Sequence, residues 1–309
     1  MRQPQGWPRV AVVGAGAVGG YFGGMLARAG APTVMIGRPA FVEAVRKTGL
    51  DLDTLQFKEN VRVEASSELG SVRGAEIVLF CVKTTDNAAV ASALAPLLAP
   101  GALVISMQNG VDNAEQIRQA SGIGALPAVV YVAASVPESG RVQHVGRGDL
   151  VVGPRNTGTE RIAGLFERAG VPCRISENIE GELWTKLTWN CALNAVSALG
   201  RAKYGHVAAS EDARLVVETA VHEVLAVARA AGIQPPGLEE PQAALAGAFK
   251  IATQMAEALS STAQDMNRGR RTEIDSLNGY IARRGRELGV PTPVNHVLYT
   301  LVKLAEGRR

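Results

Sequence analysis

The sequence predicts an α/β N-terminal domain, built on a doubly wound and mostly parallel sheet, followed by an all-α C-terminal domain. Short apolar runs alternate with helical segments through the first half of the chain, which is the pattern of parallel strands joined by helices. From Glu180 onward, the periodic segments are all helical. The 309 residues, 47% hydrophobic and 20% charged, are enough for two cores, and we expect domains at 1–178 and 179–309.

The first half alternates in a regular order. "RVAVVGAG" is a β-branched run that ends in glycines and predicts a buried strand. "AVGGYFGGMLARAG" predicts a helix closed by Gly30, and "APTVMIGR" predicts a second strand. Further strands are expected in "EIVLFCVK", "GALVISMQNG", "ALPAVVYVAASV" and "GDLVVGPR", a helix in "DNAAVASALAPLLAP", and a helix and strand in "TERIAGLFERAGVPCRIS".

The second half has helical periodicity in four long segments. These are "IEGELWTKLTWNCALNAVSAL", "DARLVVETAVHEVLAVARAAG", "TEIDSLNGYIARRGRELG" and "NHVLYTLVKLAEG". Breakers such as "GIQPPGLEEP" and "GVPTP" separate them. The C-terminal domain is therefore expected to consist of helices alone.

Composition and charge argue against several classes of protein. The net charge of +3 gives no case for a nucleic-acid or membrane surface. Cys81, Cys173 and Cys191 are scattered and form no CxxC pair, so we expect reduced core thiols in a cytoplasmic protein. The four histidines are equally dispersed, and no metal site is expected. No apolar run reaches the roughly 20 residues of a membrane span, and the polar start "MRQPQGWPR" lacks the apolar stretch of a signal peptide.

A glycine-rich motif follows the first predicted strand. It has the G-x-G-x-x-G pattern and consists of Gly14, Ala15, Gly16, Ala17, Val18 and Gly19. Glycine lets the backbone approach a pyrophosphate, and the start of the following helix supplies N–H groups and a positive dipole end. Between a strand and a helix, the motif predicts a dinucleotide-binding loop of the Rossmann type. The alternative is a tight turn without a ligand.

The end of the second predicted strand indicates which dinucleotide binds. An NAD site usually has an Asp or Glu about 20 residues after the glycines, but "VMIGRP" places Gly37 and Arg38 there. A guanidinium at this position suits the 2′-phosphate of NADP. We therefore predict NADP as the cofactor, with a solvated loop arginine as the alternative reading of Arg38.

Motifs in a fixed order extend over nearly the whole chain. They are "VVGAGAVGGYFGGMLARAG", "CVKTTD", "ISMQNGVDN", "RVQHVGRGDLVVG", "WTKLTWNCALNAVSAL", "SSTAQDMNRGRRTEIDSLNGYI" and "GVPTPVN". With them the chain resembles the ketopantoate reductase (2-dehydropantoate 2-reductase) family. The resemblance implies an N-terminal Rossmann domain, a helical C-terminal domain and an active site in the cleft between them.

The same resemblance implies an activity and its partners. The family reduces a 2-oxo acid to a 2-hydroxy acid with NADPH, and ketopantoate becomes pantoate on the route to pantothenate and coenzyme A. We expect a small-molecule 2-oxo acid substrate, no nucleic acid and no membrane, with a homodimer as a candidate assembly. Many chains with this pattern are paralogues that act on another branched or polar 2-oxo acid, so the motifs define the chemistry better than the substrate.

The resemblance also assigns roles to residues of the second half. Lys186 matches the general acid of the family, and Asn190 and Asn194 on the same helix match substrate-binding amides. Glu273 of "TEID" and Ser261 of "SSTAQ" match residues that help hold the substrate. The catalytic residues expected are therefore Lys186 and Glu273.

Two further matches lie beside the cofactor. They are Lys83 of "CVK" and Asn109 of "QNG", and we expect Asn109 to contact substrate as well and Glu273 to contact cofactor as well. One departure is mild, since Ser197 stands where a Thr is common in the family.

The predicted helix around Lys186 places three polar groups on one side. At about 100° per residue, positions i, i+4 and i+8 drift by only about 80°, so Lys186, Asn190 and Asn194 lie near one face. A protonated lysine there can donate a proton to a carbonyl oxygen that gains charge during reduction. The alternatives are a snorkelling surface lysine and asparagines that cap neighbouring backbone.

Glu273 and Ser261 each have a simpler structural explanation. Thr272 and Asp275 have the spacing of a capping box, so Glu273 would lie in the first turn of a helix and interact with its dipole. The functional reading is that Glu273 accepts a hydrogen bond from a substrate hydroxyl and keeps Lys186 charged. Ser261 could cap a helix with Gln264 or hold a substrate carboxylate at that helix start.

Six arginines cluster in the C-terminal half of the chain. The arginines at 268, 270, 271, 283, 284 and 286 are expected to form a solvated face.

Opine-type or 3-hydroxy acid dehydrogenases share the two-domain layout, but they place their catalytic Lys or His in other motifs. An NADPH-binding sensor without chemistry should have lost the lysine or the glutamate, and both are present here.

Overall fold

The computed structural model describes residues 6–307, which divide into two compact units. The first unit contains the chain up to Gln108 and the segment from Asp112 to Ile179. The second contains Asn109–Val111 and the chain from Glu180 onward. Residues 1–5, which belong to the polar start discussed above, and residues 308–309 lie outside this description. Within residues 6–307, no helix combines the length and apolarity that crossing a bilayer requires.

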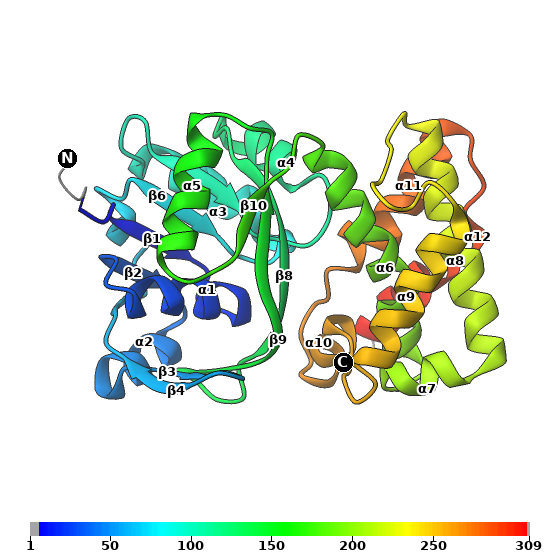
Figure 1. Ribbon diagram of the computed structural model, residues 1–309, viewed down its shortest axis with the longest axis horizontal. Coiled ribbons are helices and arrows are strands. Elements are labelled where there is room, and N and C mark those ends of the chain that lie inside the picture. Colours follow the sequence, from blue (N-terminus) through cyan, green and yellow to red (C-terminus); the bar gives the residue numbers. More distant parts are fainter. Residues whose placement is uncertain (1–5, 308–309) are drawn as a thin grey trace. The chain divides into compact units, whose positions relative to one another are not determined.

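The first unit is a ten-stranded sheet with helices packed against it (Figure 1). The strand order is β4-β3-β9-β8-β7-β6-β1-β2-β5, with β10 beside β9. All pairs are parallel except β3–β4 and β8–β9. The strands are β1 (Val10–Val13), β2 (Thr33–Ile36), β3 (Leu50–Asp53), β4 (Lys58–Val61), β5 (Glu64–Ser66), β6 (Ile77–Phe80), β7 (Leu103–Ser106), β8 (Leu126–Ser135), β9 (Arg141–Val152) and β10 (Cys173–Ile175). The predicted α/β fold with a mostly parallel sheet is confirmed.

Helices cover both faces of this sheet because alternate strand residues point to opposite sides. In β1, Val10 and Val12 join a core with α1, α2 and α5, whereas Ala11 and Val13 join a core with α3 and α4. The α-helices are α1 (Ala17–Arg28), α2 (Pro39–Thr48), α3 (Asn87–Leu94), α4 (Asn113–Ser121) and α5 (Thr157–Arg168). The short 3₁₀ helices are η1 (Leu69–Val72), η2 (Thr84–Asp86) and η3 (Ala95–Leu97).

The strand order reverses at β1, which determines where a ligand can approach. β1 pairs with β2 on one side and with β6 on the other, with Val13 opposite both Ile36 and Phe80. In doubly wound sheets, ligands bind outside the carboxyl ends of the strands at such a switch point. The loops that follow β1, β2 and β6 therefore start at this binding edge.

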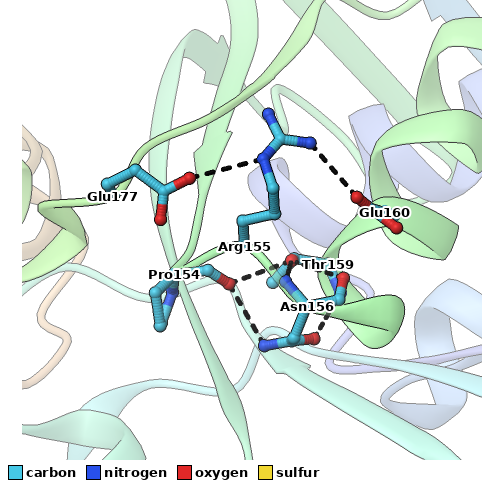
Figure 2. Close-up of polar contacts among 6 residues, drawn as sticks. All are labelled: Pro154, Arg155, Asn156, Thr159, Glu160 and Glu177. Carbon is cyan, nitrogen blue, oxygen red and sulfur yellow. Dashed lines mark hydrogen bonds and ion pairs between the residues drawn. The ribbon is translucent and has the colours of Figure 1, made fainter.

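Helix α5 shows how local polar contacts fix the last part of the first unit (Figure 2). The Asn156 side chain accepts from the Thr159 backbone N–H at 2.9 Å, and the Thr159 side chain accepts from the Asn156 N–H, which makes a complete capping box. Arg155 bridges Glu160 and Glu177 at 3.2 and 3.3 Å. These ion pairs are exposed and contribute little to stability, so the cap is the stronger constraint.

The second unit is built from helices around α6 (Ile179–Leu199). One side of α6 packs through Ala192 and Leu193 on α7, α8 and α9, and another packs through Trp184 and Leu187 on α8 and α11. The other helices are α7 (Tyr204–Ala209), α8 (Glu211–Ala230), α9 (Pro241–Gln254), α10 (Ser261–Asn267), η4 (Ile274–Ser276), α11 (Asn278–Leu288) and α12 (Pro293–Glu306). The predicted helical C-terminal half is confirmed.

The structure also contains elements that the sequence pattern does not predict. They are helices α2, α4, α7 and α9 and strands β3, β4 and β5. β4 shows why, because three of its four residues are exposed and polar, and it is held by antiparallel pairing with β3 and by the ion pair of Glu59 with Arg28 on α1. Segments of this kind lack the hydrophobic periodicity on which a sequence-based prediction depends.

Candidate active site

The glycine loop lies between β1 and α1, as the motif predicts. Gly14 has φ +101°, and a Cβ there would lie 2.7 Å from the carbonyl carbon of Cys81. A Cβ on Gly19 would overlap the carbonyl oxygen of Gly14. A Cβ on Gly16 would meet no atom within 4 Å. Two glycines are therefore required by packing, whereas Gly16 leaves open space at the start of the helix.

This open space fits the pyrophosphate of a dinucleotide. Gly16 is the N-cap residue of α1 and offers no side chain to its first N–H groups. Such a helix start attracts an anion through its N–H groups and the helix dipole. Ala15, Ala17 and Val18 bring small or modest side chains to the same loop.

Arg38 and Lys83 follow neighbouring strands of the binding edge. Arg38 is the exposed N-cap residue of α2, directly after β2 and Gly37, and it forms no ion pair with another residue in the range 6–307. Lys83 is half-buried at the start of η2, three residues after β6 ends. Both residues follow strands that end at the edge of the sheet where the sequence predicts the cofactor to bind.

Lys186 belongs to a hydrogen-bonded group within the second unit. Its Nζ donates to Asn109 Oδ1 at 2.8 Å, and Asn109 Nδ2 donates to Glu273 Oε2 at 3.2 Å. All three side chains are half-buried. The Asn109 carboxamide thus connects the Lys186 ammonium to the Glu273 carboxylate, and these two residues are 87 positions apart in the sequence. Such a group can hold a proton donor in one direction.

The two asparagines of α6 differ in their surroundings. Asn190 is half-buried, and its amide has no hydrogen-bond partner in the described part of the chain. Asn194 is buried, with 3% of its surface exposed. Its Oδ1 accepts from the Tyr204 hydroxyl at 2.9 Å, and its Nδ2 lies 3.5 Å from the hydroxyl of the exposed Ser261. The Asn190 amide is therefore available to bind a ligand, whereas the Asn194 amide is already hydrogen-bonded to Tyr204.

Tyr204 is a residue that the sequence did not indicate. Burial raises the pKa of its phenol, so the hydroxyl stays protonated and donates to Asn194. In the sequence, a tyrosine near a helix start is indistinguishable from a core aromatic. Only its contact with Asn194 reveals a link to the predicted site.

Two local expectations about helix starts are wrong. Thr272 and Asp275 form no capping box: the Thr272 hydroxyl accepts from the Ile274 N–H and bonds Glu306, and Asp275 pairs with Lys303 at 2.9 Å. Glu273 instead precedes the short helix η4, and α11 begins only at Asn278. Tertiary partners on α12 attract these side chains away from the local cap.

The cap of α10 is Ser260, and Ser261 is the first residue of the helix. The Ser260 hydroxyl accepts from the Ala263 N–H at 3.0 Å and donates to the Asn194 carbonyl at 2.9 Å. Gln264 donates to the Leu259 carbonyl instead of closing a box. Because Ser260 does the capping, the Ser261 hydroxyl is left exposed beside Asn194.

A doubly wound sheet with a glycine loop, joined to a helical unit that carries a lysine, an amide and a carboxylate, is typical of dinucleotide-dependent oxidoreductases. Residues 10–157 match the family model for ketopantoate reductase PanE/ApbA, and residues 178–306 match the model for ketopantoate reductase PanE/ApbA C terminal. The chain belongs to this family and is an oxidoreductase of the 2-dehydropantoate 2-reductase type that acts on an oxo acid.

Individual relatives cover almost the whole chain. A 2-dehydropantoate 2-reductase from Pyrococcus horikoshii is 31% identical over 97% of this chain and 98% of its own. The crystal structure of a PanE/ApbA family ketopantoate reductase from Ralstonia eutropha JMP134 is 48% identical, with a TM-score of 0.91 over 97% of this chain and 99% of that one. A D-mandelate dehydrogenase with NADH and anilino(oxo)acetate has a TM-score of 0.89 over 97% and 98% of the two chains at 22% identity, which shows a shared fold only.

Proposed function

We propose that the protein reduces 2-dehydropantoate (ketopantoate) to (R)-pantoate with NADPH, a step in pantothenate and coenzyme A biosynthesis. The observation that carries this proposal is the 2.8 Å hydrogen bond that directs the Lys186 ammonium at Asn109 beside Glu273. The relatives named 2-dehydropantoate 2-reductase support the choice of substrate. The first unit would hold the cofactor, and the second would hold the substrate and the proton donor.

The residues of the second unit account for the chemistry at the ketone. Bound NADPH supplies the hydride. As the carbonyl becomes an alcohol, negative charge develops on its oxygen, and the Lys186 ammonium donates a proton to that atom. Asn109 accepts from Lys186 and so limits the directions in which the ammonium can point. Glu273 accepts a hydrogen bond from a substrate hydroxyl and stabilises the positive charge of the lysine.

Three further side chains would bind the rest of the substrate. The Asn190 amide is available for this purpose, and the Ser261 hydroxyl lies exposed next to Asn194. Tyr204 fixes the Asn194 carboxamide so that its NH₂ group faces Ser261. A hydroxylated 2-oxo acid, which is polar along its length, matches this set of donors and acceptors.

The cofactor would be held by the loop Gly14–Gly19, with Lys83, Asn109 and Glu273 as further contacts. Arg38 would bind the 2′-phosphate, since the end of β2 offers a guanidinium and no acid. NADPH is therefore preferred to NADH in this proposal. Light scattering on the purified protein would decide between the candidate homodimer and a monomer.

The alternative is a paralogous reductase of another branched or polar 2-oxo acid. The fold also occurs in a D-mandelate dehydrogenase, so the fold does not by itself select the substrate or the nicotinamide cofactor. Oxidation of NADPH and NADH should be followed with ketopantoate, 2-oxoisovalerate, pyruvate and oxaloacetate. We expect the highest kcat/KM for ketopantoate with NADPH; a higher value for another acid would replace the proposed substrate and keep the reaction class.

A further inference from the structure

A cluster of buried carboxamides lies in the first unit, where the ends of β6 and β7 meet the starts of α3 and α4. Asn87, Gln108 and Asn113 are exposed by 2%, 6% and 4%. Burying an amide costs free energy unless its donors and acceptors find partners. These three residues, together with Gln116, satisfy one another, and the Lys186 chemistry uses none of their side chains directly.

Gln108 is held from three directions. Its Nε2 donates to the Val82 carbonyl at 2.8 Å and to Asn87 Oδ1 at 2.5 Å. Its Oε1 accepts from the Ser106 hydroxyl at 2.9 Å. The Gln108 side chain is therefore fixed in one position just after β7. It contacts the backbone of Val82, which precedes Lys83 in the sequence.

Asn87 links Gln108 to the start of α4. Its Nδ2 donates to Asn113 Oδ1 at 2.9 Å and to Gln116 Oε1 at 3.1 Å. The Gln116 amide in turn donates to Asp112 Oδ2 at 2.8 Å. One carboxamide thus joins the end of β7 to the residues at the start of α4.

These contacts fix both ends of a short segment that carries a site residue. Gln108 and Asp112 are the neighbours in sequence of Asn109–Val111, and both belong to the first unit. Asn109–Val111 belongs to the second unit, where Asn109 accepts from Lys186. With only three residues between two anchored ends, the backbone of Asn109 has little freedom.

We propose that the hydrogen-bonded carboxamides Gln108, Asn87 and Gln116 position Asn109 for catalysis, with Asn87 as the central residue of the three. The proposal rests on the function proposed above for Lys186 and Asn109. Asn87 is a positioning residue, because it acts through Gln108 and the start of α4 and touches no reacting atom. Loss of its contacts would let the Asn109–Val111 segment shift, and shifts of about 1 Å at a site can reduce turnover by about 10²-fold.

Packing alone does not explain why amides occupy these positions. α3 and α4 already pack through the apolar residues Ala91, Leu94 and Ile117. A leucine at position 87 would extend that core, whereas hydrogen bonds with defined directions specify one arrangement of the segments they join. The amides therefore select a geometry that apolar packing would leave open.

The test compares Asn87→Leu with Thr159→Val, which removes the capping hydroxyl of α5 in the same unit (Figure 2). Both variants lose buried hydrogen bonds, but Thr159 has no connection to Asn109. We expect Asn87→Leu to lower kcat by about tenfold to 10²-fold, while its Kd for NADPH changes less than about threefold. Thr159→Val should keep the wild-type kcat at a similar loss in Tm. A kcat within twofold of wild type for folded Asn87→Leu would overturn the proposal.

Asn109→Ala separates failure of this inference from failure of the proposed function. If Asn87 acts through Asn109, Asn87→Leu should have almost no further effect on kcat in the Asn109→Ala background. If Asn87→Leu lowers kcat in the Asn109→Ala background by the same factor as in the wild-type protein, Asn87 does not act through Asn109. If Asn109→Ala alone leaves turnover unchanged, the role assigned to Asn109 in the proposed function is wrong.

A second variant keeps the test decisive if Asn87→Leu does not fold. Gln116→Leu removes the contacts to Asn87 and Asp112 from a residue at the edge of the network. We expect a smaller fall in kcat, of about threefold to tenfold, that again disappears in the Asn109→Ala background. Unchanged kcat in folded Gln116→Leu would contradict the proposal.

Discussion

The glycine loop of the first unit and the lysine group of the second unit represent two ways of building a site. The loop is one continuous stretch, Gly14–Gly19, and it works through backbone shape and open space. The lysine group joins side chains that lie 77 and 164 positions apart in the chain. A steric requirement can be recognised in a short stretch of sequence, because it selects glycine at fixed spacing. A hydrogen-bonded group of common residue types cannot be recognised in this way, because its members lie far apart in the chain.

The two regions should therefore fail in different ways when they are mutated. A side chain added to the loop meets fixed backbone atoms, so both the fold and cofactor binding should suffer. A side chain removed from the lysine group should leave the helices in place and remove the proposed proton donor or the residues that hold it. Substitutions in the two regions can therefore be told apart by whether they reduce turnover, cofactor binding or Tm.

Lys186→Ala should have the largest effect on turnover. Removing the proton donor should lower kcat by about 10²-fold to 10⁴-fold, while the Kd for NADPH stays near the wild-type value. Steady-state kinetics and a cofactor titration measure the two quantities. Lys250→Ala, on an exposed position of α9, serves as the control. Turnover close to wild type in Lys186→Ala would show that another group protonates the product.

Gly14→Ala should damage the first unit and its cofactor site together. The left-handed φ and the close carbonyl of Cys81 make the substitution strained, at a cost of about 1–3 kcal/mol for the backbone conformation alone. Thermal unfolding should show a lower Tm, and NADPH should bind weakly. Gly164→Ala in α5, where a Cβ meets nothing within 4 Å, should leave both unchanged or raise the Tm. Equal behaviour of the two variants would contradict the steric explanation.

Arg38→Ala should change cofactor preference more than it changes turnover. Loss of one charged hydrogen-bonding partner should weaken NADPH binding by about tenfold or more, with NADH binding nearly unchanged. The ratio of kcat/KM for the two cofactors measures this preference. Arg73→Ala, another exposed arginine of the first unit, is the matched control. An unchanged ratio in Arg38→Ala would mean that Arg38 does not recognise the 2′-phosphate.

Tyr204→Phe should have the smallest effect of the four. It removes one hydrogen bond to Asn194 and keeps the ring, at a cost of about 1 kcal/mol. We expect KM for the 2-oxo acid to rise about fivefold with little change in the Kd for NADPH. Thr188→Val removes a buried hydroxyl from the same helical unit without touching Asn194, and it should leave KM unchanged. The same KM in both variants would remove Tyr204 from the site.

The sequence predicted most of the first unit because its strands are short, buried and β-branched. β1, β2, β6 and β7 are nearly continuous apolar runs, which is the pattern of parallel strands covered on both faces. The hairpin of β3 and β4 was missed because β4 is mostly polar and exposed, so only its hydrogen-bonded pairing with β3 identifies it as a strand. The short helix α7 was missed for a similar reason, since it depends on its neighbours more than on periodicity.

The helix starts around Glu273 and Ser261 could not be predicted from neighbouring residues alone. Thr272 has the sequence neighbours of a capping residue, but Glu306 on α12 competes for its hydroxyl. Ser260 and Ser261 are both suitable caps, and contact with the Asn194 carbonyl favours the first. In both cases a partner distant in sequence decided between local alternatives that the sequence leaves almost equal.

The amino-acid sequence alone predicts the fold class of both halves, the position of the glycine loop and the candidate catalytic side chains. Hydrophobic periodicity and glycine sterics act over a few neighbouring residues, so they can be recognised along the chain. Only the tertiary structure decided that Asn109 belongs with Lys186 and Glu273, and that Tyr204 holds Asn194. Hydrogen bonds between residues so far apart form only when the packing of whole helices brings their side chains together, and no short stretch of sequence encodes that packing.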